Sequence, residues 1–181
     1  MHNLRIPYRQ ITVASASLVL TACSGLHNVD HKWCPPEAAA TPAPTQETVN
    51  LQADTLFRFD GSQLKDMLPA GRAQLDSLAN HLIEAYVHID HIALKGYTDR
   101  LGPKAYNQRL SQARANTVRD YLLAHGVHTP MTAIGMGESD PVTTICQGNK
   151  ASARLIACLQ PDRRVVVHVQ GTKKLEPDKK P

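Results

Sequence analysis

Aromatic residues are scarce in this sequence. Phe, Trp and Tyr make up 4% of the 181 residues, so a hydrophobic core must rest on Leu, Ile, Val and Ala. Apolar residues as a whole are not lacking: 42% of the chain is hydrophobic and 20% is charged, a globular composition rather than a disordered one. The length leaves room for one ordinary domain plus extensions.

A concentrated basic surface is also missing. The formal net charge is only +4, and part of it lies in the end segments, at Arg5, Arg9 and the lysines from Lys173 onward. A nucleic-acid-binding domain normally gathers its Lys and Arg residues on one face. We therefore expect no nucleic acid partner.

Sequence signatures of catalysis are absent too. The chain contains no H-E-x-x-H motif, no nucleophile elbow and no spaced acid pair. A cell-wall hydrolase would have to use Glu138 or Asp140, which lie in a Gly-rich turn, or His88, Asp90 and His91. On a strand, His91 would face away from the other two. We expect no enzyme activity, no metal and no cofactor.

The uncharged and mostly apolar run near the start, residues 11–22, is too short to cross a bilayer as a helix, which needs about 20 residues. It follows a basic start and leads into Leu-Thr-Ala-Cys, so residues 1–22 are predicted to be an export signal peptide. The Leu-Thr-Ala-Cys stretch resembles the lipobox of bacterial lipoproteins. That resemblance implies lipidation of Cys23 and, with Ser24 after it, sorting to the outer membrane.

After the lipidated cysteine the composition changes. Residues 23–50 hold four prolines among Ala, Thr and Gln without an apolar period, which predicts a semi-extended tether. We expect a single domain at residues 51–171 and a flexible polar tail at 172–181. This tether could let an anchor and a ligand lie in different layers.

The remaining cysteines are interpreted in the light of export. In an oxidising compartment Cys146 and Cys158 are expected to form a disulfide, which would stabilise the fold by about 3 kcal/mol. A zinc site is the rival interpretation, but no C-x-x-C pair or matching histidine spacing accompanies them. Cys34 is left over and is either free or paired between molecules.

The apolar pattern of the domain alternates between strand and helix periods. Strands are expected near 54–59, 89–97, 131–136 and 164–170, and helices from Pro69 and over 104–125. This β-α-β-α-β-β order predicts an α+β sandwich in which two main helices pack on one face of a mixed four-stranded sheet.

One charged pair stands out. Asp99 follows the second predicted strand, and Arg114 lies on the flank of the buried face of the second helix, where an unpaired charge would be costly. The simpler interpretation is an internal salt bridge between them. The other is a binding pair separated by a gap, with Asp99 holding an ammonium group and Arg114 a carboxylate, which would suit a zwitterion.

Several motifs together resemble the C-terminal, peptidoglycan-associating domain of the OmpA family. They are Gly96-Tyr97-Thr98-Asp99, Gly135-Met136-Gly137-Glu138-Ser139-Asp140-Pro141-Val142 and Asp162-Arg163-Arg164-Val165. The likeness covers about residues 52–171 and includes the Cys146–Cys158 pair. With the lipidated cysteine and tether, the whole resembles the architecture of the peptidoglycan-associated lipoproteins.

The resemblance implies a ligand and its contacts. The ligand would be diaminopimelate in uncrosslinked peptidoglycan stem peptides, bound non-covalently so that the outer membrane is anchored to the cell wall. By position, the residues that would bind it are Asp99 for the ammonium, Arg114 for the carboxylate, Asn107 and Thr98 for hydrogen bonds, and Asp60 with Gly61 at the rim.

Two positions depart from the family pattern. Tyr97 stands where members often have His, and Val166 where they often have Glu, but neither change removes the two charges. Arg163 and Arg164 are expected to be rim or sheet-edge residues rather than ligands.

An alternative function is that of an accessory lipoprotein in a secretion or envelope complex, which would use wall binding to hold a protein partner. In that case partner contacts are expected in the tether, around Trp33 and Cys34. Under both hypotheses the domain lies in the periplasm, held to the outer membrane through the lipid on Cys23.

Overall fold

The structure, a computed structural model, describes residues 43–175. Its elements follow in the order β1 (Pro44–Gln52), α1 (Ala53–Leu56), α2 (Pro69–Ala85), β2 (Tyr86–Gly96), α3 (Lys104–Ala124), β3 (Met131–Gly135), α4 (Ala153–Cys158) and β4 (Arg164–Lys173). Short 3₁₀ helices occur at Leu64–Asp66 and Gln160–Asp162.

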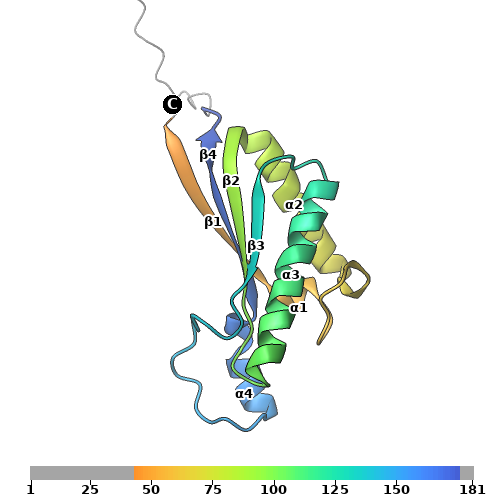
Figure 1. Cartoon of the computed structure of the whole chain (residues 1–181), viewed down its shortest axis with the longest axis vertical. Helices are drawn as coiled ribbons and strands as arrows, with labels where there is room; N and C mark the ends of the chain where they lie inside the picture. Colours follow the sequence, from red (N-terminus) through yellow and green to blue (C-terminus); the bar gives the residue numbers. More distant parts are fainter. Residues whose placement is uncertain (1–42, 176–181) are drawn as a thin grey trace, which may run out of the picture. The chain divides into compact units, whose positions relative to one another are not determined.

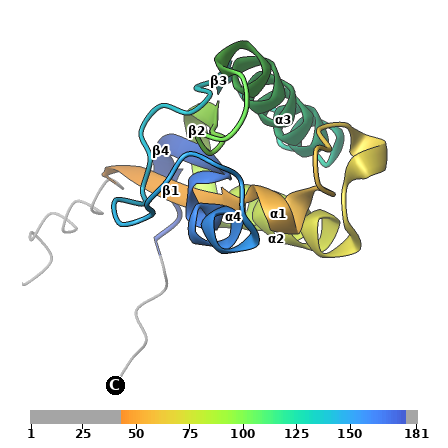
Figure 2. The ribbon, with the colours of Figure 1, turned by 90° about the horizontal axis from the view of Figure 1, so that it is seen from below.

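The four strands form one mixed sheet in the order β1-β4-β2-β3 (Figure 1). The last strand in sequence lies between the first two and is antiparallel to both, whereas β2 and β3 are parallel and are connected through α3. Helices α2 and α3 lie on the same side of the sheet, as the views in Figures 1 and 2 show. The predicted α+β sandwich is confirmed.

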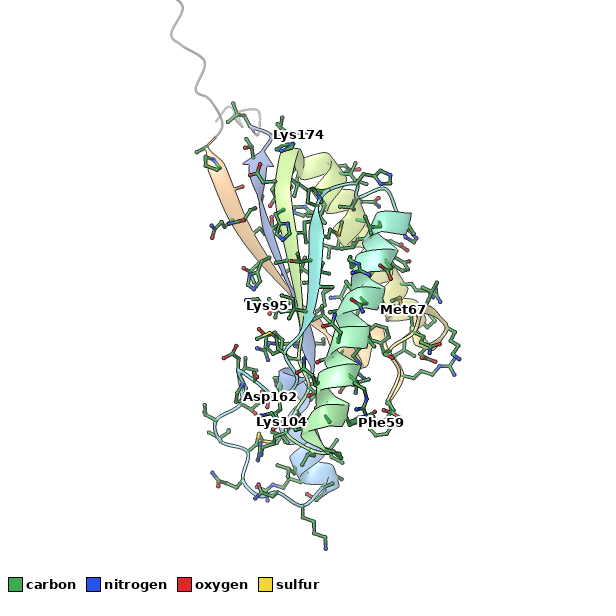
Figure 3. All side chains as sticks on the ribbon, in the orientation of Figure 1. Phe59, Met67, Lys95, Lys104, Asp162 and Lys174 are labelled. Atoms are coloured by element: carbon green, nitrogen blue, oxygen red, sulfur yellow. A yellow bond between two sulfur atoms is a disulfide. The ribbon has the colours of Figure 1, made fainter. Side chains whose placement is uncertain are left out.

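The core between this sheet face and the two helices is aliphatic, as the shortage of aromatic residues predicts. Alternate residues of β4 and β2 are fully buried and meet the apolar stripes of α2 and α3. The contributing residues include Val165, Val167, Val169, Ile92, Leu94, Leu75, Leu82, Val118 and Leu122. Lys95 projects from the opposite face of the sheet (Figure 3).

The strand predicted at residues 54–59 is wrong. Ala53–Leu56 is a single helical turn, and Phe57 is buried and makes an isolated bridge with Met67. The two phenylalanines, two residues apart, suggested one strand face, but Phe59 is 98% exposed while Phe57 belongs to the core. Asp60 then takes a positive φ of 63° and turns the chain back.

The first strand lies earlier, at Pro44–Gln52, within the stretch predicted to be tether. The domain therefore begins before Leu51, and the rest of the predicted tether lies outside the described residues. An edge strand can start with proline and keep a polar outer side, so its pattern lacked the expected apolar run. At the other end, β4 continues to Lys173, into the predicted tail.

Glu47 ties this early strand to the rest of the domain. Its carboxylate accepts hydrogen bonds from the Tyr86 hydroxyl at 2.8 Å and the His81 ring at 3.1 Å, and pairs with Lys173 Nζ at 2.6 Å. Partial burial acts to raise the pKa of Glu47, but the hydrogen bonds from Lys173, Tyr86 and His81 together outweigh it and lower the pKa to about 2.

Two glycines bring α3 into backbone contact with the sheet. A Cβ on Gly96 would collide with the Ser111 carbonyl, and one on Gly135 would collide with the Gln112 backbone amide. Gly96 ends β2 and Gly135 ends β3, so the close contact occurs at the strand ends. It places the N-terminal half of α3 beside the loop that carries Asp99.

We expect Glu47→Gln to lower the free energy of unfolding at pH 7 by about 1–2 kcal/mol, since it removes a charge that several donors stabilise. Because folding depresses this pKa from 4.5 to about 2, the stabilisation is complete above pH 4.5 and disappears as the pH falls toward 2. Urea unfolding at several pH values should show the difference from wild type shrinking over that range. Glu84→Gln, an exposed change on α2, is the control; a pH-independent difference would contradict the prediction.

Candidate functional site

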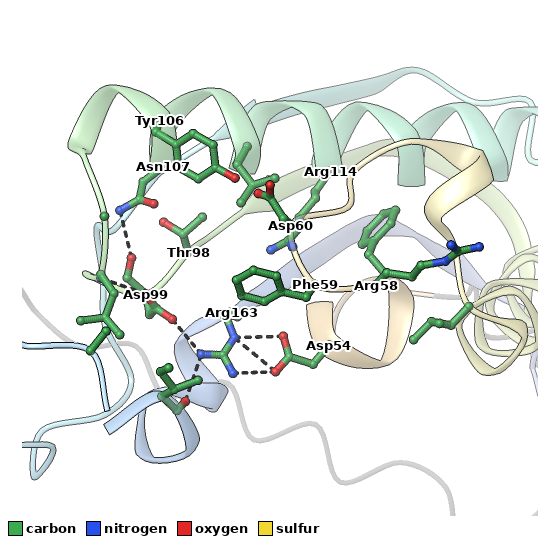
Figure 4. A pocket seen from close by; sticks show the side chains of 17 residues that line it. Asp54, Arg58, Phe59, Asp60, Thr98, Asp99, Tyr106, Asn107, Arg114 and Arg163 are labelled. Atoms are coloured by element: carbon green, nitrogen blue, oxygen red, sulfur yellow. Dashed lines mark hydrogen bonds and ion pairs between the residues drawn. The ribbon is translucent and has the colours of Figure 1, made fainter. Parts of the chain in front are cut away.

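A cleft of about 540 Å³ opens at the end of the sheet where β2 stops and β4 begins. Four segments surround it: α1 with the loop after it, the loop after β2, the N-terminal half of α3, and α4 (Figure 4). Of the six binding residues predicted from sequence, five line this cleft: Asp60, Thr98, Asp99, Asn107 and Arg114.

Asp99 is held by two donors. Its Oδ1 accepts the Leu101 backbone N–H at 2.8 Å, and its Oδ2 accepts Arg163 Nη1 at 2.7 Å. Within residues 43–175 this Arg163 contact is the only ion pair that Asp99 makes. The direct Asp99–Arg114 salt bridge, the simpler interpretation of the two charges, does not form.

Arg114 is 4% exposed and rises from α3 into the cleft wall. Its Nε donates to the Gly61 carbonyl at 2.9 Å, and its guanidinium lies 5.7 Å from the centre of the Phe57 ring. Burial lowers the pKa of Arg114, and Asp54 is the strongest charge opposing that effect. No acceptor for its terminal nitrogens occurs among the described residues, so they remain available to a carboxylate.

Thr98 lies between the two charges in Figure 4 and is 5% exposed. Its Oγ1 is buried and has no hydrogen-bond partner within the described part of the chain. An unmet buried hydroxyl costs free energy, so Thr98 is a polar group beside the cleft that the described residues leave unsatisfied.

Asn107 has its amide donors already engaged. Nδ2 donates to the Asp99 carbonyl at 3.2 Å and to Glu138 Oε2 at 3.1 Å. The side chain thereby fixes the Asp99 loop, and its Oδ1 is the atom left for a ligand donor. Glu138, one of the rival hydrolase candidates, thus serves to hold Asn107.

The rim residues have different roles. Asp60 lines the cleft, whereas Gly61 does not; its carbonyl orients Arg114 from behind. A side chain on Gly61 would collide with Asp66, which explains the glycine. Phe59, beside Asp60, points into solvent at the cleft mouth (Figures 3 and 4).

Arg163 belongs to the cleft itself, contrary to the expectation of a rim or sheet-edge residue. Its Nε and Nη2 donate hydrogen bonds to the Asp54 carboxylate, at 2.9 and 2.6 Å, while Nη1 donates to Asp99. Asp54 had been placed on a strand, so nothing in the sequence pattern brought it near Arg163. Arg164 departs from the expectation too: it does not line the cleft and is buried at the start of the central strand β4, with its guanidinium 3.9 Å from the centre of the Tyr97 ring.

The Cys146–Cys158 disulfide is present and closes the loop that forms one wall of the cleft. From this loop, the Ile156 carbonyl accepts Arg163 Nη1 at 3.1 Å. Arg100, next to Asp99, donates to the Cys146 carbonyl at 2.7 Å. The disulfide-closed loop therefore contacts Arg163, the ion-pair partner of Asp99, and Arg100, its neighbour in the chain.

The hydrolase candidates on β2 lie away from the cleft. His88 pairs with Asp90 at 3.3 Å, and His91 shares a hydrogen bond with Thr132; none of the three lines the cleft. Within residues 43–175 no group of three or more His, Cys, Asp or Glu side chains is arranged to hold a metal.

Comparison with known proteins identifies relatives over this domain. A family model described as the OmpA family matches residues 56–154. Outer membrane protein A of Shigella flexneri is 44% identical over 142 residues, covering 76% of this chain and 40% of that protein. Outer membrane protein A of Shimwellia blattae is 47% identical over 123 residues, covering 67% and 50% respectively. The matches thus span half or less of these relatives.

Solved structures agree. The cell wall anchor of the T6SS from Pseudomonas aeruginosa superposes with a TM-score of 0.53 and 25% identity, covering 71% of this chain and 82% of that one. The peptidoglycan-associated lipoprotein from Burkholderia pseudomallei gives a TM-score of 0.50 and 28% identity, covering 67% and 89%. With the family model matching more than half of its residues, this chain belongs to the OmpA family.

Proposed function

We propose that the domain binds the free zwitterionic end of diaminopimelate in uncrosslinked peptidoglycan stem peptides and so attaches the outer membrane to the cell wall. One observation carries the proposal: Asp99 and Arg114 face one cleft without pairing, and a buried hydroxyl without a partner lies between them.

Each ionic end of such a ligand has a matching group. The ammonium would sit on Asp99, each of whose oxygens accepts a single protein donor and has capacity for another. The carboxylate would take the terminal nitrogens of Arg114 as a fork. Thr98 Oγ1 and Asn107 Oδ1 would complete the contacts, which is the role the family resemblance implies for these two side chains.

The relatives support a wall-binding role without catalysis. Their names describe an outer membrane protein, a peptidoglycan-associated lipoprotein and a cell wall anchor, none of them an enzyme. The cleft chemistry agrees, because its charges are held in place by hydrogen bonds rather than arranged as a nucleophile with its base.

A second candidate function is that of an accessory lipoprotein in one secretion complex, and the likeness to the T6SS anchor favours it. Wall binding would then hold a protein partner, contacted through the segment around Trp33 and Cys34, which lies outside the described residues. Photocrosslinking in cells from position 33 would capture one abundant partner under this candidate and none under general tethering.

We expect Asp99→Ala and Arg114→Ala each to abolish cosedimentation of the full-length protein, in detergent, with diaminopimelate-containing sacculi. Each change leaves one ionic end of the ligand without a group of opposite charge in the cleft. Asp120→Ala and Arg109→Ala, exposed changes on α3, serve as charge-matched controls. Binding by both cleft variants at the wild-type level would refute the site.

Thr98→Val should separate binding from stability. Because Oγ1 has no partner in the described structure, the free energy of unfolding is expected to stay the same or rise, while affinity for a soluble diaminopimelate muropeptide falls about threefold to tenfold. Calorimetric titration and urea unfolding test the two effects. A loss of stability with unchanged affinity would contradict the assignment of Thr98.

Membrane attachment is proposed to run through acylated Cys23, which lies outside the described residues. Within residues 43–175 no helix combines the length and apolarity that a membrane span requires. Intact mass of the membrane-purified protein should show a chain that starts at Cys23 and carries acyl groups. Cys23→Ser should release the protein to the soluble periplasmic fraction; a variant that remains in the membrane would refute this anchor.

A further inference from the structure

Arg163 lies where three segments of the domain meet. Its backbone carbonyl accepts the Ala53 N–H at 2.9 Å, which places the residue beside α1. Its side chain is 16% exposed and reaches Asp54 with Nε and Nη2, Asp99 with Nη1, and the Ile156 carbonyl with the same Nη1. Every nitrogen of the guanidinium is therefore engaged, and the group is held in one orientation (Figure 4).

This contact determines the orientation of the Asp99 carboxylate. Leu101 N–H holds one oxygen and Arg163 holds the other, so the plane of the carboxylate is set before any ligand arrives. Asp54, which takes two Arg163 nitrogens, competes for the same positive charge. The hydrogen bonds with Asp54, and then those with Asp99, raise the pKa of Arg163, so the bridge stays charged.

The charges around the cleft balance because of Arg163. Three acidic residues, Asp54, Asp60 and Asp99, and three arginines, Arg58, Arg114 and Arg163, line the cleft. Removing Arg163 would leave an excess negative charge beside Asp99. A net negative cleft attracts a simple amine, but it repels the carboxylate of a zwitterion.

We propose that Arg163 is a positioning residue that orients Asp99 for the ligand ammonium and, through the charge balance with Asp54, makes the cleft select an amino-acid zwitterion over an amine. This inference rests on the proposed function and deepens it. The residue acts through Asp99 and need not touch the ligand.

The test compares two soluble muropeptides that differ at one position of the stem, diaminopimelate in one and lysine in the other. Lysine presents an amine without the second carboxylate. Calorimetric titration of the full-length protein in detergent is expected to show wild type preferring diaminopimelate. In Arg163→Gln that preference should fall about tenfold, chiefly through weaker binding of the zwitterion. Arg109→Gln, an exposed change of equal charge on α3, should keep the wild-type preference.

A double-mutant cycle with Asp54 separates charge balance from general damage. Asp54→Asn alone leaves Arg163 to neutralise Asp99, so binding of both muropeptides should weaken about tenfold. The double variant Asp54→Asn with Arg163→Gln restores the charge balance but not the orientation of Asp99, so it should bind diaminopimelate more tightly than either single variant and less tightly than wild type. If Arg163 were merely structural, the double variant would bind the diaminopimelate muropeptide at least as weakly as either single variant.

The conservative substitution provides an independent measurement. Arg163→Lys keeps the positive charge but not the planar group that contacts Asp54 and Asp99 together, so it should keep more of the wild-type preference for diaminopimelate than Arg163→Gln while its affinity stays reduced.

The outcomes are distinguishable. Failure of wild type to bind either muropeptide would refute the proposed function itself. If wild type binds and Arg163→Gln keeps its preference, or the double variant is no better than the single ones, the role of Arg163 is overturned and the site stands. Should near-UV circular dichroism show that Arg163→Gln does not fold, unchanged binding by Asp54→Asn would still overturn the inference.

Discussion

The backbone contact between α3 and the ends of β2 and β3 is the constraint on which the cleft depends. Gly96 and Gly135 allow it, because any side chain at either position would meet the α3 backbone near Ser111 and Gln112. Arg114 lies one turn further along the same helix, and Asp99 follows β2 by three residues. The separation of the two charges is therefore set by close helix–sheet packing rather than by a flexible loop.

Arg114 and Asp99 do not pair with each other, because each has other partners in the protein. Arg114 is attached to a carbonyl and faces an aromatic ring, and Asp99 is attached to a backbone amide and to Arg163. A buried charge with too few contacts would be costly. These contacts compensate each charge but leave it able to form further hydrogen bonds. The disulfide loop supports this arrangement from outside, through Ile156 and Arg100.

The sequence pattern predicted most of the polar residues that line the cleft but not the contacts that each of them makes. Thr98 and Asp99 occur in a motif typical of the family and Arg114 occurs on the second predicted helix, and the structure brings all three to one cleft. Gly61 lies behind Arg114, and the donors of Asn107 are engaged by the protein. Such roles depend on which atom faces the cleft, and spacing along the chain does not encode that.

The missed features have physical causes. The strand at Pro44–Gln52 is an edge strand with a polar outer side, so its apolar signal is weak, whereas two phenylalanines suggested a strand at 54–59 where the chain turns. Arg163 was expected at the rim because its partner Asp54 is 109 positions away and sits on a helical turn that no pattern predicted.

By itself, the sequence determined the two main helices, the last three strands, the aliphatic core and the pair of cysteines that become a disulfide, since periodicity and residue type are local properties. Only the tertiary structure decided that Asp99 pairs with Arg163 and leaves Arg114 open to the cleft. An ion pair forms between whichever charges the fold brings within reach, and that proximity arises from the packing of segments distant in sequence.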